Sequence, residues 1–215
     1  MTDLRAATTS RTSAPAGTLA ALREVVRAHD ALVVAFSGGA DSALLAWVAT
    51  DELGRDRVRC VTAVSPSLPA DELDHCRAVA REWGLAWSTV TTDELDDPAY
   101  VANGTDRCYH CKEALSVAIE PLVAAAGATL ALGVNLDDLG DHRPGQQAAA
   151  ERGAVFPLVE AGLSKALVRE HSRVLGLRTA DRPAAACLAS RVPYGTPVTL
   201  AVLREVETAE AALRR

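Results

Sequence analysis

Short apolar runs alternate with longer amphipathic stretches along most of this chain. The apolar runs predict four strands, at residues 31–36, 58–64, 86–92 and 129–134. The amphipathic stretches predict helices, at residues 41–53, 70–83, 109–126 and 165–175. Strands and helices in alternation indicate an α/β fold, with a parallel sheet that helices cover on both faces. In such a fold, ligands bind outside the carboxyl ends of the strands.

The two ends of the chain depart from this alternation. Residues 1–18 are rich in Thr, Ser, Ala and Arg without periodicity, which predicts a flexible arm. Residues 19–197 form the expected domain, and residues 198–215 read as the start of a C-terminal helical region. The chain has 215 residues, 49% of them apolar, which is enough for one large domain with a core.

Charge and hydropathy limit the possible partners. The net charge is -6, and acidic and basic residues are interspersed, which argues against broad electrostatic capture of nucleic acid. No apolar run approaches the roughly 18 residues that span a bilayer, and no leader precedes a cleavage site. These observations predict a cytoplasmic protein without a membrane partner.

The first predicted strand leads directly into the sequence SGGADS at residues 37–42. Ser37, Gly38 and Gly39 carry no bulky side chain, so their N–H groups can close on an anion, and the following helix adds its positive N-terminal end. Asp41 indicates a divalent cation on the phosphates, because Mg²⁺ takes carboxylate and phosphate oxygens together. A Walker loop would need a Lys-Ser or Lys-Thr pair, and a dinucleotide fingerprint a third glycine; neither is present. The loop therefore predicts a Mg-ATP site.

This loop resembles that of the PP-loop ATP pyrophosphatases, which have an adenine nucleotide alpha hydrolase-like α/β/α sandwich fold. The resemblance implies that the chain adenylates a substrate and releases pyrophosphate. It assigns Mg²⁺ to Asp41. It also implies that ATP and pyrophosphate are bound by Ala35, Ser37, Gly38, Gly39, Asp41, Ser42 and Lys165.

A second signal for an anion lies in the sequence LSKALVR at residues 163–169. Lys165 and Arg169 are four residues apart at the start of a predicted helix, so both can face one direction. Positive residues oppose the helix dipole at this end, which suggests an anion to contact, although a solvated helix face is the alternative. The pattern resembles the second signature of amidotransferase-type PP-loop enzymes, in which the lysine holds the leaving pyrophosphate.

The five cysteines divide into two kinds. An odd number without a secretion signal disfavours a disulfide scaffold, and Cys60 and Cys76 lie at apolar positions that suit packing. Cys108 and Cys111 form a Cys-x-x-Cys pair at a predicted helix start, flanked by positive charges that favour thiolates. This spacing is compatible with redox, zinc or iron–sulfur chemistry.

Cys187 lies in a predicted loop and supplies a third thiol. Three cysteines leave one iron of a cubane cluster open to an extra ligand, whereas a structural zinc would require a fourth protein ligand, for which His110 is adjacent.

Together these motifs resemble the LarE-type ATP-dependent sulfur transferases, which act in building the nickel-pincer nucleotide cofactor of lactate racemase. The resemblance extends from about residue 33 to 195 and rests, besides SGGADS and the Lys165 helix, on DRCYHCK at 106–112, GVNLDDLGDHRPG at 133–145 and CLASRVPYG at 187–195. It implies a small mononucleotide substrate, pyridinium-3,5-biscarboxylic acid mononucleotide. Each carboxylate is adenylated, and sulfur then replaces AMP.

Relatives in this family use two sulfur sources. Members with only the loop cysteine give up its own sulfur and end as dehydroalanine. Members that also carry the cysteine pair bind a four-iron four-sulfur cluster with an additional sulfide on the open iron. Because this chain has all three cysteines, the resemblance favours a cluster held by Cys108, Cys111 and Cys187, with sacrifice of Cys187 as the alternative.

The same resemblance implies further site residues. Substrate binding falls to Asn135, Asp137, Asp138, Arg143, Ser190 and Arg191. Arginine suits the mononucleotide phosphate bidentately, whereas an acidic loop at a strand end can also be simply solvated. Family members continue into a C-terminal region that binds substrate and builds an oligomer, so we expect a homo-oligomer if that region is complete.

Three other functions fit parts of the sequence. Another thiolase of the same superfamily would act on tRNA or a heterocycle, but no RNA-binding module is evident. An ammonia-dependent synthetase would share the loop and the lysine without needing three cysteines. A zinc-binding module with a degenerate nucleotide pocket would contain zinc without iron or sulfide.

Overall fold

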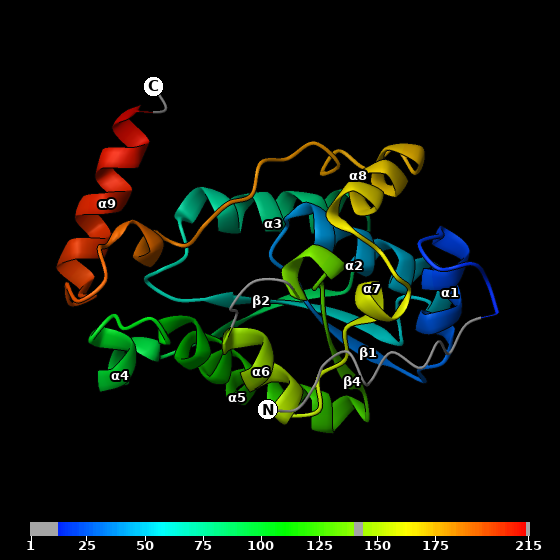
Figure 1. Ribbon diagram of the computed structural model, residues 1–215, viewed down its shortest axis with the longest axis horizontal. Coiled ribbons are helices and arrows are strands. Elements are labelled where there is room, and N and C mark those ends of the chain that lie inside the picture. The colour runs from blue at the N-terminus through cyan, green and yellow to red at the C-terminus, as the bar shows by residue number, and fades with distance from the viewer. Residues whose placement is uncertain (1–12, 140–143, 214–215) are drawn as a thin grey trace.

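The computed structural model describes residues 13–139 and 144–213. At its centre is a parallel sheet in the order β3-β2-β1-β4 (Figure 1). The strands are β1 Leu32–Ala35, β2 Val58–Val64, β3 Trp87–Thr91 and β4 Thr129–Leu132. Each strand falls inside its predicted range, and β2 matches it residue for residue. Because all four strands run parallel, their carboxyl ends meet at one edge of the sheet.

Helices cover both faces of this sheet. Their bounds are α1 Leu19–Arg27, α2 Ala40–Leu53, α3 Ala70–Glu82, α4 Pro98–Val101, α5 Arg107–Ala126, α6 Pro144–Glu151, α7 Pro157–Glu160, α8 Lys165–Val174 and α9 Leu200–Leu213. Short 3₁₀ turns lie at Glu94–Asp96 (η1), Leu136–Leu139 (η2) and Leu188–Arg191 (η3). Figure 1 shows α2 and α3 on one side of the sheet, with α5 and α6 on the other. The predicted α/β/α sandwich is confirmed.

Two apolar layers hold the sandwich together. In one layer, Leu32 and Val34 of β1 pack with apolar residues of α1, α2 and α3. In the other layer, Val33 of β1 packs with Leu115 and Ile119 of α5. Since neighbouring residues of a strand point to opposite faces, an all-apolar strand is what a sheet covered on both sides requires.

The segment before α1 is held against the domain where it is described. The side chain of Thr18 accepts a hydrogen bond from Ala21 N and so caps α1. Gly17 N donates to Ala161 O at 2.8 Å, and the Gly17 carbonyl accepts from His171 Nε2 at 2.9 Å. The predicted arm covered residues 1–18; residues 1–12 lie outside the described residues. Main-chain and capping hydrogen bonds hold residues 17 and 18, and apolar periodicity does not report such bonds.

The C-terminal part forms a third, smaller core. Leu188, Val198 and Leu203 are buried against Tyr100, apart from the two layers of the sandwich. Helix α9 stands away from the sheet (Figure 1). Its Glu207 accepts a hydrogen bond from Ala70 N, at the start of α3, at 3.0 Å. This small core therefore fixes the segment after α8 against the edge of the domain.

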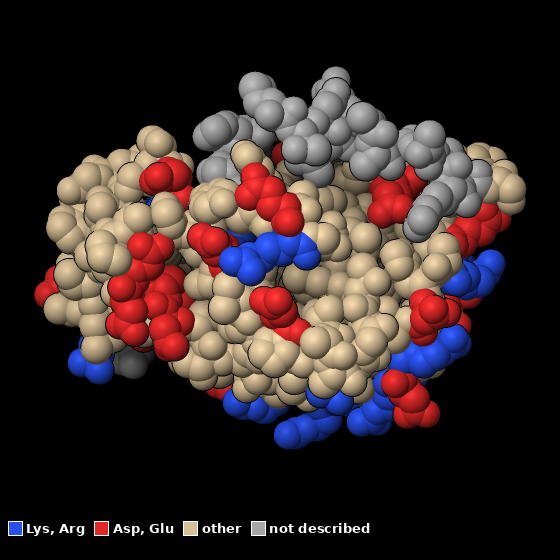
Figure 2. All heavy atoms as spheres, turned by 90° about the horizontal axis from the view of Figure 1, so that it is seen from below, with Lys and Arg blue, Asp and Glu red and all other residues tan. Residues whose placement is uncertain are grey.

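The surface shows no dominant charge of one sign in the view from below. On the face drawn in Figure 2, acidic and basic side chains of the described residues are interspersed, and a group of acidic side chains gathers at one end. No helix in the ranges 13–139 and 144–213 combines the length and the apolar character needed to cross a membrane.

Candidate active site

The SGGADS loop is a closed turn between β1 and α2. The hydroxyl of Ser42 accepts a hydrogen bond from Ser37 N at 3.2 Å and donates to Gly39 O at 3.2 Å. It also lies 3.0 Å from Ser37 Oγ. Gly38 has φ +71°, a left-handed conformation that L side chains rarely adopt. Ala35 ends β1 just before this turn. The binding of an anion by the turn stays a prediction.

Gly133, directly after β4, is in close contact with the main chain of this loop. A Cβ atom at Gly133 would lie 2.7 Å from Ser42 N and 2.9 Å from Asp41 C, closer than real side chains approach main chain. Glycine therefore lets the segment after β4 contact the first turn of α2 directly. This close approach brings Asn135 to Asp41, and Asn135 Nδ2 donates to Asp41 Oδ1 at 3.0 Å.

The acidic residues after β4 order their own loop. The side chain of Asn135, which is fully buried, accepts hydrogen bonds from Asp137 N at 3.0 Å and Asp138 N at 3.3 Å. Asn135 N donates to Asp138 Oδ2 at 3.2 Å. Asp137 Oδ2 accepts from Lys165 N at 2.6 Å and so joins this loop to the start of α8. Arg143, which the resemblance placed beside them, lies outside the described residues.

The carboxyl of Asp41 lies in a partly buried and charged environment. Burial raises the pKa of its carboxyl above the usual range, and the nearby charge of Asp138 raises it further. The hydrogen bond from Asn135 and the charge of Lys165 act in the opposite direction on this pKa. Two carboxylates that repel each other at a phosphate-binding loop suit Mg²⁺, because a divalent ion relieves that repulsion. The residues present therefore fit the predicted Mg²⁺.

Lys165 and Arg169 turn out to have different roles. Lys165 is exposed at the first residue of α8, within electrostatic reach of Asp41. Arg169 instead donates to the carbonyls of Ala180 and Arg182, at 2.8 and 3.0 Å. The expectation that both side chains face an anion is therefore wrong for Arg169. Its guanidinium satisfies carbonyl groups of a segment that has no secondary structure of its own.

The fold brings the segment of Cys187 to Cys111, although the two cysteines are far apart in sequence. Cys108 and Cys187 are exposed, whereas Cys111 is half-buried. Burial raises the pKa of the Cys111 thiol to about 11, and the charges of Cys187 and Cys108 both contribute to that rise. Cys108 and Cys187 are therefore both within electrostatic reach of the Cys111 thiol. For Cys111, the expectation that flanking positive charges favour the thiolate is wrong, because burial outweighs the charge of Lys112.

Two buried polar side chains hold the Cys187 segment beside the cysteine pair. Asn103, with φ +55° and no exposed surface, donates from Nδ2 to the carbonyls of Val192, Pro193 and Thr196, at 3.3, 2.9 and 2.8 Å. Arg107 donates to Ala189 O at 2.9 Å. Sequence reasoning missed both residues. The only available signal was an arginine directly before Cys108, which was interpreted as a charge near the thiols.

A cavity of about 260 Å³ lies next to Cys187. It is lined by Pro69, Glu72, Arg182, Pro183, Ala184, Ala185, Ala186 and Arg191. Arg182 pairs with Glu72 at 2.6 Å, and Arg191 pairs with Glu210 of α9. Ser190 Oγ donates to Cys187 O at 2.7 Å and accepts from Arg191 at 2.9 Å. Of the two residues predicted to hold a phosphate, Arg191 lines this cavity, and Ser190 contacts both Arg191 and the carbonyl of Cys187.

The segment of Cys187 is fastened at both ends and exposed between them. Arg169 and Glu72 hold Arg182 at one end, and Leu188 N donates to Ser67 O at 2.9 Å at the other. Residues 183–187 are exposed and belong to no helix or strand. Cys187 is therefore a free thiol on a short strap beside the cavity.

The cysteines and His110 suggested two kinds of metal site, a zinc site and an iron–sulfur cluster. Within the described ranges, no three His, Cys, Asp or Glu side chains are grouped tightly enough to share one metal ion. A cubane cluster binds its cysteines through different irons, so its ligands need not converge on one ion. His110, the possible fourth zinc ligand, has Nδ1 at 2.9 Å from Asp97 and Nε2 at 3.6 Å from Asp106. Three free thiols fit an iron–sulfur cluster by their chemistry.

The fold and the loop define a class of protein, the PP-loop enzymes that use ATP. The sequence profile of the NAD synthase family matches residues 18–107. A solved structure, the U34-tRNA thiolase NcsA from Methanococcus maripaludis with its four-iron four-sulfur cluster, is similar with a TM-score of 0.55 and 16% identity. The similarity covers 90% of this chain and 72% of that one, and it supports the fold.

Similarity in sequence narrows this class to one family. The chain is 36% identical over 197 residues to the pyridinium-3,5-bisthiocarboxylic acid mononucleotide synthase of Lactiplantibacillus plantarum, covering 91% of this chain and 70% of that protein. It is 47% identical over 195 residues to an uncharacterized protein of Synechocystis sp., covering 90% of this chain and 72% of the other. The chain belongs to the LarE-type family of ATP-dependent sulfur transferases.

Proposed function

We propose that this protein adenylates a carboxylate of a small mononucleotide and then exchanges AMP for sulfur. The proposed substrate is pyridinium-3,5-biscarboxylic acid mononucleotide, because the product of this substrate gives the name of the Lactiplantibacillus plantarum relative. The observation that carries the proposal is the position of the exposed Cys187 thiol, beside a cavity and within electrostatic reach of the Cys108 and Cys111 pair.

The first step forms an acyl adenylate. An oxygen of the substrate carboxylate attacks the α-phosphorus of ATP, and the bond to pyrophosphate breaks. The N–H groups of the SGGADS loop and the ammonium of Lys165 would hold the leaving pyrophosphate, and Asp41 would hold Mg²⁺. Fixed charges that face the developing negative charge account for most of what such a site contributes to the rate.

The second step forms a thiocarboxylate. A sulfur nucleophile attacks the acyl carbon, a carbon–sulfur bond forms, and AMP leaves with the electron pair of its bond to that carbon. A four-iron four-sulfur cluster held by Cys108, Cys111 and Cys187 would supply a transferable sulfide. The cavity between Arg182 and Arg191 would receive the substrate, with Ser190 and Arg191 at its phosphate and Asn135, Asp137 and Asp138 shaping the side toward ATP.

A second source of sulfur is supported by the exposure of Cys187. In that route, its thiolate attacks the acyl carbon and AMP leaves. Loss of the Cα proton of Cys187 then breaks its Cβ–Sγ bond, which leaves dehydroalanine in the chain and the sulfur on the substrate. This route needs no cluster, and each chain reacts once.

The two routes are separated by anaerobic purification with iron and sulfide assays, followed by mass analysis after turnover. We expect iron and sulfide in the protein and an intact Cys187 after more than one turnover. A protein that lacks both and loses the mass of one hydrogen sulfide at Cys187 would support sacrifice. If substrate and ATP give no pyrophosphate at all, the proposed function is wrong.

A further inference from the structure

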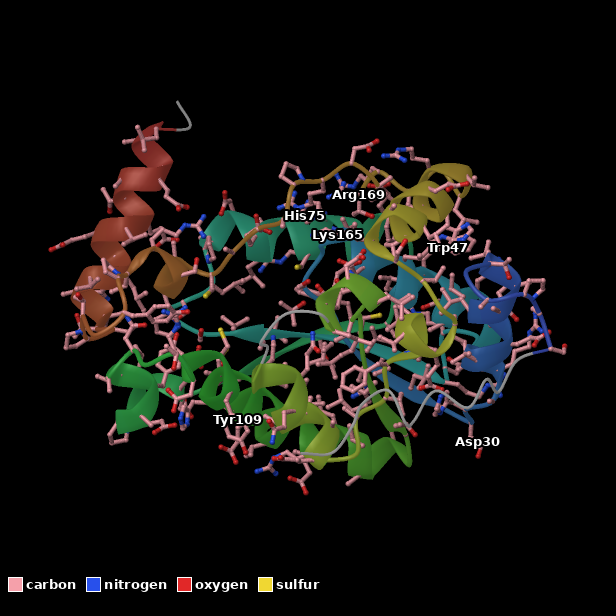
Figure 3. The ribbon with its side chains drawn as sticks, in the orientation of Figure 1. Asp30, Trp47, His75, Tyr109, Lys165 and Arg169 are labelled. Carbon is pink, nitrogen blue, oxygen red and sulfur yellow. The ribbon has the colours of Figure 1, made fainter. Side chains whose placement is uncertain are left out.

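His75 reaches from α3 to the main chain of the SGGADS loop. Its Nε2 lies 3.1 Å from Gly38 O. The ring is packed directly on this glycine, because a Cβ at Gly38 would lie 2.8 Å from His75 Cδ2 and 3.0 Å from Cys76 Sγ. Figure 3 shows His75 in the same region as Lys165 and Arg169. A side chain that no motif includes therefore contacts the centre of the phosphate loop.

This contact fixes the orientation of one peptide unit. A carbonyl oxygen can only accept, so Nε2 carries the proton and donates to Gly38 O. A trans peptide is planar, so the carbonyl of Gly38 and the N–H of Gly39 point in opposite directions. When His75 holds the carbonyl toward α3, the N–H of Gly39 points away from α3. Within the described part of the chain, this N–H has no hydrogen-bond partner.

Without such an anchor, the peptide between Gly38 and Gly39 would turn easily. Neither residue has a Cβ, and glycine adopts both signs of φ at little cost. The hydrogen bonds of Ser42 hold Ser37 N, in the peptide between residues 36 and 37, and Gly39 O, in the peptide between residues 39 and 40. Among the described side chains, His75 is the one that hydrogen-bonds to the peptide between Gly38 and Gly39.

The surroundings of His75 keep its ring neutral and in place. Burial lowers the pKa of His75, and the nearby charges of Arg182 and Arg178 lower it further, whereas the hydrogen bond to Gly38 and the charge of Glu72 act in the opposite direction. Arg182 is itself held by Glu72 at 2.6 Å. A neutral ring with its proton on Nε2 is the form that donates to Gly38 O.

We propose that His75 is a positioning residue for ATP: by holding the Gly38 carbonyl, it aims the Gly39 N–H at the pyrophosphate. The inference rests on the proposed function, in which this loop binds the pyrophosphate part of ATP.

The test compares two substitutions of similar size. His75→Leu removes the donor, whereas His75→Gln places an amide N–H near the position of Nε2. In ¹⁵N-glycine-labelled protein, Mg-pyrophosphate should shift the Gly39 amide resonance of the wild type and His75→Gln, but much less that of His75→Leu. The KM for ATP in pyrophosphate release should rise roughly tenfold in His75→Leu, as expected for one lost hydrogen bond to a charged group, and return close to the wild-type value in His75→Gln.

The possible results separate the inference from the proposed function. If His75→Leu keeps the wild-type KM for ATP and the wild-type Gly39 shift, the role of His75 is wrong while the ATP site stands. If the wild type itself binds neither ATP nor pyrophosphate, both proposals fail. Should His75→Leu not fold, His75→Asn takes its place, because its amide is too short to reach Gly38.

Discussion

Two regions of this protein are built in different ways. We call the SGGADS loop with the segment after β4 the nucleotide end, and the region of Cys108, Cys111 and Cys187 the thiol end. At the nucleotide end, the chain positions groups through main-chain contacts: a left-handed Gly38, a Gly133 that admits no Cβ, and a fully buried Asn135. At the thiol end, two exposed cysteines and a half-buried one are positioned by side chains, chiefly Asn103 and Arg107.

The difference matches what each end would have to do in the proposed reaction. A site that always binds the same anion benefits from a rigid backbone, since preorganised donors need no rearrangement. A site that passes sulfur to a substrate must leave its reactive atom accessible. The following substitutions separate the two ends, and they are arranged from the largest expected effect to the smallest.

Cys187→Ala should abolish sulfur transfer while leaving pyrophosphate release intact. The exposed thiol beside the cavity-lining residues 182–186 is lost, whereas the SGGADS loop, which we propose binds ATP, is untouched. Thiocarboxylate is measured by mass spectrometry and pyrophosphate by an enzymatic assay. Cys60→Ala, at a buried cysteine of β2, serves as the control and should retain both activities. Equal loss of both steps in Cys187→Ala would contradict the division between the two ends.

Asp41→Asn should slow pyrophosphate release by roughly 10²- to 10³-fold, the size of effect seen when one electrostatic group at a reacting centre is removed. The substitution keeps an oxygen for the Asn135 amide but removes the charge that Mg²⁺ needs. Single-turnover release of pyrophosphate measures the effect. Asp74→Asn, on the surface of α3, is the matched control. A release rate within a few-fold of wild type would exclude Asp41 as the metal ligand.

Gly133→Ala should lower the free energy of unfolding by about 3 kcal/mol, the upper part of the usual cost of overpacking, because the added Cβ meets main chain that cannot move aside. Affinity for ATP should fall with it. Urea denaturation measures the stability. Gly104→Ala is the control, because its Cβ would meet the flexible end of Asp106 at 2.6 Å. Equal stability of the two variants would show that the contact at Gly133 is unimportant.

Asn103→Ala should lower the free energy of unfolding by about 2 kcal/mol, since it leaves one buried and two part-buried carbonyls without their donor. Sulfur transfer should fall more than pyrophosphate release, because Asn103 holds the segment after Cys187, at residues 192–196, and does not contact the SGGADS loop. Both rates are measured on the same preparation. If pyrophosphate release falls as much as sulfur transfer, the two ends are coupled more tightly than their contacts indicate.

The smallest effect concerns pH and the raised pKa of Asp41 in the protein without Mg²⁺. Its folded pKa exceeds the unfolded value, so its ionised form destabilises the fold above that pKa, and the cost is relieved as pH falls through it. Asp41→Asn should therefore be more stable than the wild type at pH 7, and the difference should shrink toward pH 4. Urea midpoints at both pH values measure this, and a constant difference would contradict it.

The sequence predicted the strands and the SGGADS turn better than the side chains that hold distant segments together. The four strands and the SGGADS turn follow from apolar runs and glycine chemistry, which act locally. Asn103, Arg107 and His75 form hydrogen bonds with carbonyls that are far away in the sequence. A local sequence pattern therefore cannot predict their roles. For Arg169 the sequence predicted a partner that the structure does not show. Its position next to Lys165 suggested an anion, but its partners are two carbonyls of a segment without secondary structure.

The strap that carries Cys187 has a consequence for any competing sulfur donor. Anchored at Arg182 and Leu188, the thiol explores only a small volume beside the cavity, and short flexible tethers give an effective concentration on the order of millimolar. In the route in which Cys187 gives up its own sulfur, sulfide or a small thiol in the medium must approach that concentration before it can replace the tethered thiol. Rescue of Cys187→Ala by added sulfide should thus be a dose response with a millimolar midpoint.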